Sequence, residues 1–279
     1  MNMKEYVLEL ANYAVSRALS LRFDEALAVV KRYRRSMARI ANSQIAVIQS
    51  WDDVRVTIYV AKGKKVAVIE SRVSDRSDID KLLNDYKRYI EVLEESRFYA
   101  PLPRPTGRPL SNLVDKNVIA GVERIGEYAE LMVESAHKEG AERTAGAITL
   151  EICGRGLVSS SGAELYEDKS RVEAYLRAFI GEASGHWAYG SRMLSSAGLQ
   201  EVGERAARYV HEARKQIRVE PGQYTAILSP LVVGNLFEYV VEAASAFSVL
   251  TGFSMFTRHK VGDAVSYTHL RAHETSLHL

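Results

Sequence analysis

The sequence predicts an α+β fold: two α+β domains with antiparallel sheets, followed by the start of a third domain. Stretches with apolar residues at helical spacing alternate with stretches in which every second residue is apolar. The strand candidates follow one another with glycine-containing turns between them, which is typical of antiparallel sheets. A segment rich in proline separates the first set of helices and strands from the second.

The first domain is expected over residues 1–100. Residues 3–20 have the spacing of an amphipathic helix, and "VRVTIYV" at 54–60 alternates strictly before the turn "AKGKK" and the returning strand "VAVIES". A second helix is expected with Ser77 or Asp78 as its N-cap. The pattern of residues 23–53 fits either a helix or strands.

Residues 101–112 hold four of the six prolines and are predicted to form a stiff linker. The second domain, residues 113–220, should contain a helix that ends at Gly140, three strands up to residue 180 and a helix over 199–217. Residues 221–264 would begin the third domain, with a short buried strand in "EPGQYTAILSP" and an apolar helix over 231–250.

The composition excludes several classes of protein. With 47% hydrophobic and 26% charged residues and a net charge of +2, the chain is an ordinary globular protein without a general basic stripe for nucleic acid. The basic run "KRYRRSMAR", Lys31–Arg39, is interpreted as a solvated face, with a phosphate-binding patch as the alternative. The single cysteine, Cys153, is interpreted as a core residue rather than a nucleophile and permits no intrachain disulfide. No secretory signal or membrane-spanning segment is evident, so a cytoplasmic protein is expected.

Five short segments resemble, in this order and spacing, one known protein family. They are "GKKVAVIESRVSD", "YAPLPRP", "LVSSSGAEL" with Ser160, Ser161 and Gly162 at its turn, "GERAARYVHEA" and "EPGQYTAILSPLVVGNLFEYVVEAASA". Over residues 1 to about 264 the chain thus resembles the TldD/PmbA family, once described as modulators of DNA gyrase. The resemblance implies strands for much of Ala26 to Trp51 and a β-rich third domain.

The family contains two kinds of chain, and the resemblance assigns this one to the second kind. TldD-type chains carry the zinc motif H-E-x-x-x-H on the helix after the "lsP" segment, whereas TldE (PmbA) chains lack it. Here Phe237 takes the place of the first histidine, Glu238 that of the glutamate and Glu242 that of the second histidine. A phenyl group cannot ligate a metal, so no metal ligand and no catalytic residue is expected in this chain. Any zinc would belong to a TldD-type partner.

The resemblance therefore implies the non-zinc subunit of a heterodimeric metalloprotease that acts on unfolded peptides. A non-proteolytic binding protein that modulates DNA gyrase or a toxin–antitoxin pair is the alternative. A third hypothesis, a hydrolase that uses Cys153 or Ser161, requires a histidine partner, for which only His186 and His211 remain open.

The last fifteen residues, 265–279, contain His269, His273 and Glu274 at a spacing that would suit a zinc helix. Val265 to Thr275, however, agree with one reading frame of a transposase sequencing adapter. We therefore expect this tail to be an artefact and the chain to be truncated near Ala264.

Overall fold

A computed structural model describes residues 2–105, 113–215, 217–260 and 263. The chain divides into two compact units, Met1–Ile217 and Arg218–Leu279. Among the described residues, no helix is long and apolar enough to cross a membrane.

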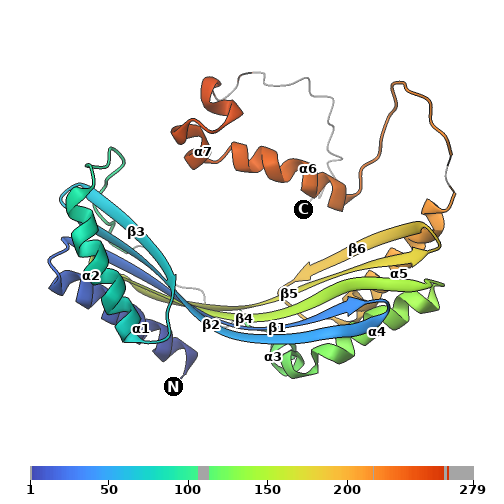
Figure 1. The fold of residues 1–279 in the computed structure, drawn as a ribbon, viewed down its shortest axis with the longest axis horizontal. Coiled ribbons are helices and arrows are strands. Elements are labelled where there is room, and N and C mark those ends of the chain that lie inside the picture. Colours follow the sequence, from blue (N-terminus) through green and yellow to red (C-terminus); the bar gives the residue numbers. More distant parts are fainter. Residues whose placement is uncertain (1, 106–112, 216, 261–262, 264–279) are drawn as a thin grey trace, which may run out of the picture. The chain divides into compact units, whose positions relative to one another are not determined.

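The first unit is organised around one six-stranded sheet with the order β3-β2-β1-β4-β5-β6 (Figure 1). Every pair of neighbouring strands is antiparallel, which confirms the predicted α+β class with antiparallel pairing. The strands are β1 (Glu25–Ala41), β2 (Gln44–Lys62), β3 (Lys65–Arg72), β4 (Arg143–Ser159), β5 (Glu164–Ile180) and β6 (Ala183–Ser191).

The pairing of β1 with β4 runs from Leu27↔Ser159 to Ile40↔Gly146. It joins the segments 1–100 and 113–220 into a single sheet, although the sequence pattern predicted one sheet for each. Residues 23–53, which the pattern left ambiguous, form most of β1 and β2, as the family resemblance implied. The predicted hairpin at Gly63 is also confirmed, because β2 ends at Lys62, β3 begins at Lys65 and Gly63 adopts a positive φ of 56°.

Two helices, α1 (Met3–Ser20) and α2 (Arg76–Val92), cover one end of the sheet. A capping box of Asn2 and Glu5 begins α1. Asp75 caps α2, so the expected caps Ser77 and Asp78 were wrong by two to three residues. Both helices pack their apolar stripes onto the sheet, and the shared core includes Val7, Val30, Ile58, Ile79 and Leu83.

The other end of the sheet is covered by α4 (Ile125–Lys138) and α5 (Ser196–Ala213), with the short helices α3 (Lys116–Gly121) and η1 (Val122–Arg124) beside them. Close packing of α5 depends on Gly203. A Cβ atom there would lie 2.3 Å from the backbone oxygen of Met132 on α4. Their core includes Ile40, Ile148, Leu150, Leu176 and Val210.

Both cores lie on the same face of the sheet, because the buried residues of β1, β2, β4 and β5 that form them are at even-numbered positions. Figure 1 shows the sheet as a bowed layer with its helices on one side. Between the two cores that face carries polar contacts instead. Arg32 there donates two hydrogen bonds to the Asp52 carboxylate, at 2.8 and 2.7 Å, which hold the pKa of Asp52 below its usual value.

Two strand predictions need correction. The first two of the three strands expected up to residue 180, namely 145–153 and 154–170, are not separate: residues 143–159 form one long strand, β4, and residues 164–170 begin β5. Residues 183–191, between the last predicted strand and the helix expected over 199–217, form a further strand, the edge strand β6. There Gly185 faces α5, and a Cβ atom on it would lie 2.3 Å from the backbone oxygen of Ala206.

The second unit contains α6 (Pro230–Ala243), α7 (Ala246–Thr251) and the turn η2 (Met255–Arg258). The helix expected over 231–250 is interrupted at Ser245, whose side chain caps α7. The buried strand expected in residues 220–230 is wrong, because those residues form neither helix nor strand before Pro230 and Ile227 is 99% exposed.

Candidate functional site

The three residues at the positions of the zinc motif lie on α6. Phe237, Glu238 and Glu242 are all exposed there, and Ser229 caps the helix. Phe237 offers no lone pair to a metal, and the two remaining carboxylates provide no imidazole, so this set does not fit a zinc ion. Among the described residues, no group of three or more His, Cys, Asp or Glu side chains could hold a metal. His269, His273 and Glu274 lie outside the described residues.

The residues of the hydrolase hypothesis are not brought together. The Ser161 hydroxyl donates to the carbonyl of Pro103 at 2.8 Å, and the His211 ring lies 2.7 Å from the carbonyl of Glu139. The His186 ring lies beside that of Tyr175, with 6.0 Å between the centroids and 43° between the ring planes. Cys153, interpreted as a core residue, is 4% exposed and thus buried, but it belongs to neither hydrophobic core and lies on the face of the sheet opposite the helices. Each side chain has a structural contact of its own, and none forms the nucleophile–base pair that catalysis needs.

The face of the sheet opposite the helices, called the bare face below, carries the most unusual chemistry of the chain. Odd-numbered residues of four strands point to it and lie opposite one another in three rows of the register. The rows, read from β2 through β1 and β4 to β5, are Arg55–Lys31–Arg155–Glu167, Asp53–Tyr33–Cys153–Lys169 and Trp51–Arg35–Glu151–Arg171.

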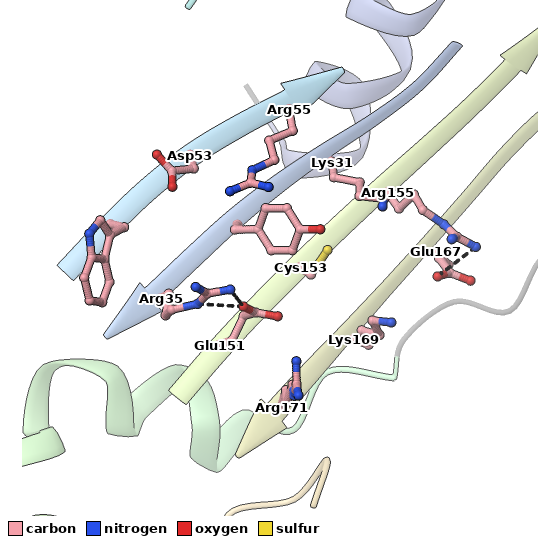
Figure 2. Close-up of a pocket in the computed structure, with 12 residues that line it drawn as sticks. Lys31, Arg35, Asp53, Arg55, Glu151, Cys153, Arg155, Glu167, Lys169 and Arg171 are labelled. Atoms are coloured by element: carbon pink, nitrogen blue, oxygen red, sulfur yellow. Dashed lines mark hydrogen bonds and ion pairs between the residues drawn. The ribbon is translucent and has the colours of Figure 1, made fainter. Parts of the chain in front are cut away.

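These twelve residues line a hollow of about 370 Å³ on the bare face (Figure 2). Six of them are basic and three are acidic, so the hollow has a basic balance although the whole chain is nearly neutral. The volume is within the range of small-ligand pockets, but its lining is charged rather than apolar.

Ion pairs compensate part of this charge, and Figure 2 shows two of them. Arg35 donates through Nε and Nη2 to the buried carboxylate of Glu151, with an Nε–Oε2 distance of 2.8 Å. Arg155 Nη2 lies 3.2 Å from Glu167 Oε1. Among the described residues, Lys31 and Lys169 form no ion pair.

Burial perturbs the neutral acids of the site. Desolvation raises the pKa of the Cys153 thiol, and the nearby Glu151 carboxylate adds to this effect, while Lys169, Lys31 and Arg155 oppose it. Desolvation likewise raises the pKa of the Tyr33 phenol. At neutral pH both groups are therefore uncharged, and they can offer a ligand hydrogen bonds but no negative charge.

Sequence reasoning missed this site. The run Lys31–Arg39 was interpreted as one solvated face, whereas the strand divides the run between both faces of the sheet. A signal was present, because Lys31, Tyr33 and Arg35 alternate with residues of the other face, as in any strand. The partners of β1 across the sheet, on the other hand, cannot be read from one sequence.

Comparisons with known proteins agree on the fold. The model of the "PmbA/TldA metallopeptidase C-terminal domain" matches residues 221–278, which include most of the tail that is expected to be adapter-derived. No curated protein matches the chain in sequence.

Solved structures match over most of this chain. TldE from Thermococcus kodakarensis has a TM-score of 0.72 at 13% identity, covering 89% of this chain and 58% of its own. A candidate modulator of DNA gyrase from Bacteroides thetaiotaomicron VPI-5482 has a TM-score of 0.73 at 15% sequence identity. The match covers 90% of this chain and 60% of that structure. Another candidate modulator of a DNA gyrase, from Thermotoga maritima MSB8, has a TM-score of 0.72 at 17% sequence identity. The match covers 90% of this chain and 58% of that structure. The chain therefore spans about 60% of the length of these structures.

The bowed sheet with helices on one face is thus the fold of TldE and of the two candidate gyrase modulators. Together with the family match in the second unit, it confirms the resemblance seen in the five sequence segments. The family match over residues 221–278 and the shared fold support the assignment to the TldD/PmbA family.

Proposed function

We propose that this chain is the non-zinc, TldE/PmbA-like subunit of a cytoplasmic heterodimeric metalloprotease. The observation that carries the proposal is the residue set of α6, where Phe237 and Glu242 stand in place of the two histidines of the zinc motif. Two neutral imidazoles are the usual core of such a zinc site, and this helix supplies none. Zinc and the attacking water therefore belong to a TldD-type partner.

The bare face of the sheet supports a role in holding peptide. It is bowed, free of the helices of its own unit and lined by polar side chains at regular strand spacing (Figures 1 and 2). An unfolded peptide is extended, so its side chains can meet such a regular array one after another. In this proposal the chain provides the wall of a peptide channel, and the partner provides the chemistry.

Reconstitution tests this proposal. The chain, a TldD-type partner and the mixture of both are each assayed on an unfolded peptide, and zinc is measured in each sample. We expect peptidase activity that depends on the mixture and is lost with a chelator, and no stoichiometric zinc in the chain alone. Chelator-sensitive activity of the chain alone, or one tightly held zinc per chain that Glu238→Gln removes, would contradict the proposal.

The names of two structural relatives favour a second candidate, a non-proteolytic modulator of DNA gyrase. The basic balance of the hollow is compatible with a nucleic-acid ligand. Binding to DNA through phosphate contacts must weaken steeply as salt is raised. A steep salt dependence of oligonucleotide binding, together with no effect of the chain on peptidase activity, would favour this candidate.

A further inference from the structure

Three basic side chains stand in a line on the bare face and define what we call the basic row: Arg55, Lys31 and Arg155. The register places Lys31 directly opposite Arg55 on β2 and directly opposite Arg155 on β4. Directly opposed residues have Cβ atoms only about 4.5–5.5 Å apart, and like charges in such pairs destabilise a sheet. The fold therefore holds a concentration of positive charge that its own packing does not require.

Among the described residues, countercharges reach only the ends of the basic row. Arg155 lies 3.2 Å from Glu167, and Arg55 lies 3.9 Å from Glu70 at an exposed position. The central residue, Lys31, is half-buried and has no ion pair among the described residues. The point of strongest repulsion is thus also the point without compensation. Local charge conflict of this kind is typical of functional sites rather than of packing.

The surroundings of the basic row restrict the ligand. Asp53, Glu151 and Glu167 also line the hollow and would repel a continuous chain of phosphates. The row itself crosses three strands, a width of roughly 10 Å, which is too short to follow a long polyanion. Tyr33 in the next row and Trp51 in the row after it add aromatic surface. An isolated acidic side chain on a peptide fits this pattern better than a nucleic acid does.

We propose that the hollow on the bare face is a binding site for an aspartate or glutamate side chain of an extended peptide, with its carboxylate held at Lys31 between Arg55 and Arg155. The inference rests on the proposed function, because it names the class of peptide that the channel wall would select. Lys169, the other lysine of the hollow without an ion pair among the described residues, would strengthen binding from β5 at longer range.

The test compares two fluorescent, unstructured peptides that differ only in one Glu-to-Gln exchange, titrated with the 279-residue chain and followed by anisotropy. Charge-assisted hydrogen bonds give the expected preference for the Glu peptide, about tenfold in Kd. Lys31→Met should abolish the preference, and Lys169→Met should reduce it. Lys81→Met is the matched control, because it removes the same charge from an exposed position on α2 and should change nothing.

Several outcomes would overturn the inference: equal affinity for both peptides, a preference that survives in Lys31→Met, or equal losses in Lys31→Met and Lys81→Met. A single-stranded oligonucleotide that binds more tightly than the Glu peptide and depends on Lys31 would assign the hollow to nucleic acid instead.

The two proposals can fail separately. Hydrolysis of the Gln peptide by the reconstituted complex tests the proposed function without the acidic side chain. If the complex cleaves both peptides equally well and the chain shows no preference in binding, the carboxylate site is refuted while the subunit role stands. If neither peptide is cleaved but the preference is present, the subunit role is refuted while the site stands.

Discussion

The two faces of the sheet are made by the same strands and have opposite properties. On β4, Ile148 and Leu150 are fully buried under helices, whereas the odd-numbered residues face the bare side, where Glu151 and Arg155 line the hollow. Neighbouring residues of a strand point to opposite faces, so one segment can serve packing and binding independently. The even-numbered positions should therefore contribute most of the apolar packing, and the odd-numbered positions should determine ligand binding.

The largest change in stability is expected at Gly203, which lies on α5, one of the helices that cover the sheet. In Gly203→Ala the new Cβ atom would lie 2.3 Å from the backbone oxygen of Met132 and 2.8 Å from the backbone nitrogen of Ala136. Because α4 and α5 must separate, the free energy of unfolding should fall by about 2–3 kcal/mol in a urea titration. Gly190→Ala is the control, since nothing lies within 4 Å of a Cβ atom there. Equal stability of both variants would refute the close packing of the two helices.

The next effect concerns the ion pair of the bare face whose carboxylate is the most buried among the described residues. The Glu151 side chain is only 7% exposed, so Arg35→Met would leave a buried carboxylate without its donor. We expect a loss of about 1–3 kcal/mol in the free energy of unfolding. Arg39→Met, at another odd-numbered position of β1 without an ion pair in the described part of the chain, should change little. The double variant Arg35→Met/Glu151→Gln should recover part of the loss, and a fully additive loss would contradict the pairing.

A smaller effect of opposite sign is expected at the basic row. Lys31→Met removes the central positive charge between Arg55 and Arg155. The free energy of unfolding should therefore rise by about 0.2–1 kcal/mol. The gain should shrink in high salt, because salt screens the repulsion that the substitution relieves. Thermal unfolding at two salt concentrations measures both effects. A destabilised variant would show that Lys31 has a packing role.

The smallest effect on stability is expected at Cys153, whose thiol can also be followed by its rate of alkylation. Because desolvation raises its pKa, the thiol is protonated at neutral pH and should react slowly with iodoacetamide until the pH is alkaline. Lys31→Met removes a charge that lowers this pKa, so the alkylation rate should fall further. Stability should also decline as pH rises from the ordinary thiol pKa through the raised one, because the folded state retains the proton longer. Rapid alkylation at neutral pH would instead favour a nucleophilic role.

Much of the fold could be predicted from local patterns. The hairpin at Gly63 and the amphipathic helices α1, α2, α4 and α5 follow from spacing and turn residues alone. The strand β6 was missed because its small residues are required by close contact with α5, and this contact exists only in the folded protein. The single sheet was missed for a similar reason, since the pairing of β1 with β4 joins residues more than a hundred positions apart.

The candidate site could be predicted from the sequence less completely than the fold. The family motif located Phe237, Glu238 and Glu242 on a helix, as observed, because a motif is a local pattern. The basic row has no local signature, since Lys31, Arg55 and Arg155 come from three strands and meet only through the register. One sequence shows that each is basic, but it cannot show that they are neighbours. The zinc-free assignment and the origin of residues 265–279 stay predictions.

Thermal unfolding of the chain and of Lys31→Met, each with and without the Glu peptide, tests most directly whether the bare face is kept for binding rather than for stability. Without peptide, Lys31→Met should have the higher Tm, because the repulsion of the basic row is relieved. With peptide at many times its Kd, the unchanged chain should gain the larger shift, since only a ligand that binds the folded state stabilises it. A lower Tm for Lys31→Met, together with equal peptide shifts in both proteins, would contradict this role of the bare face.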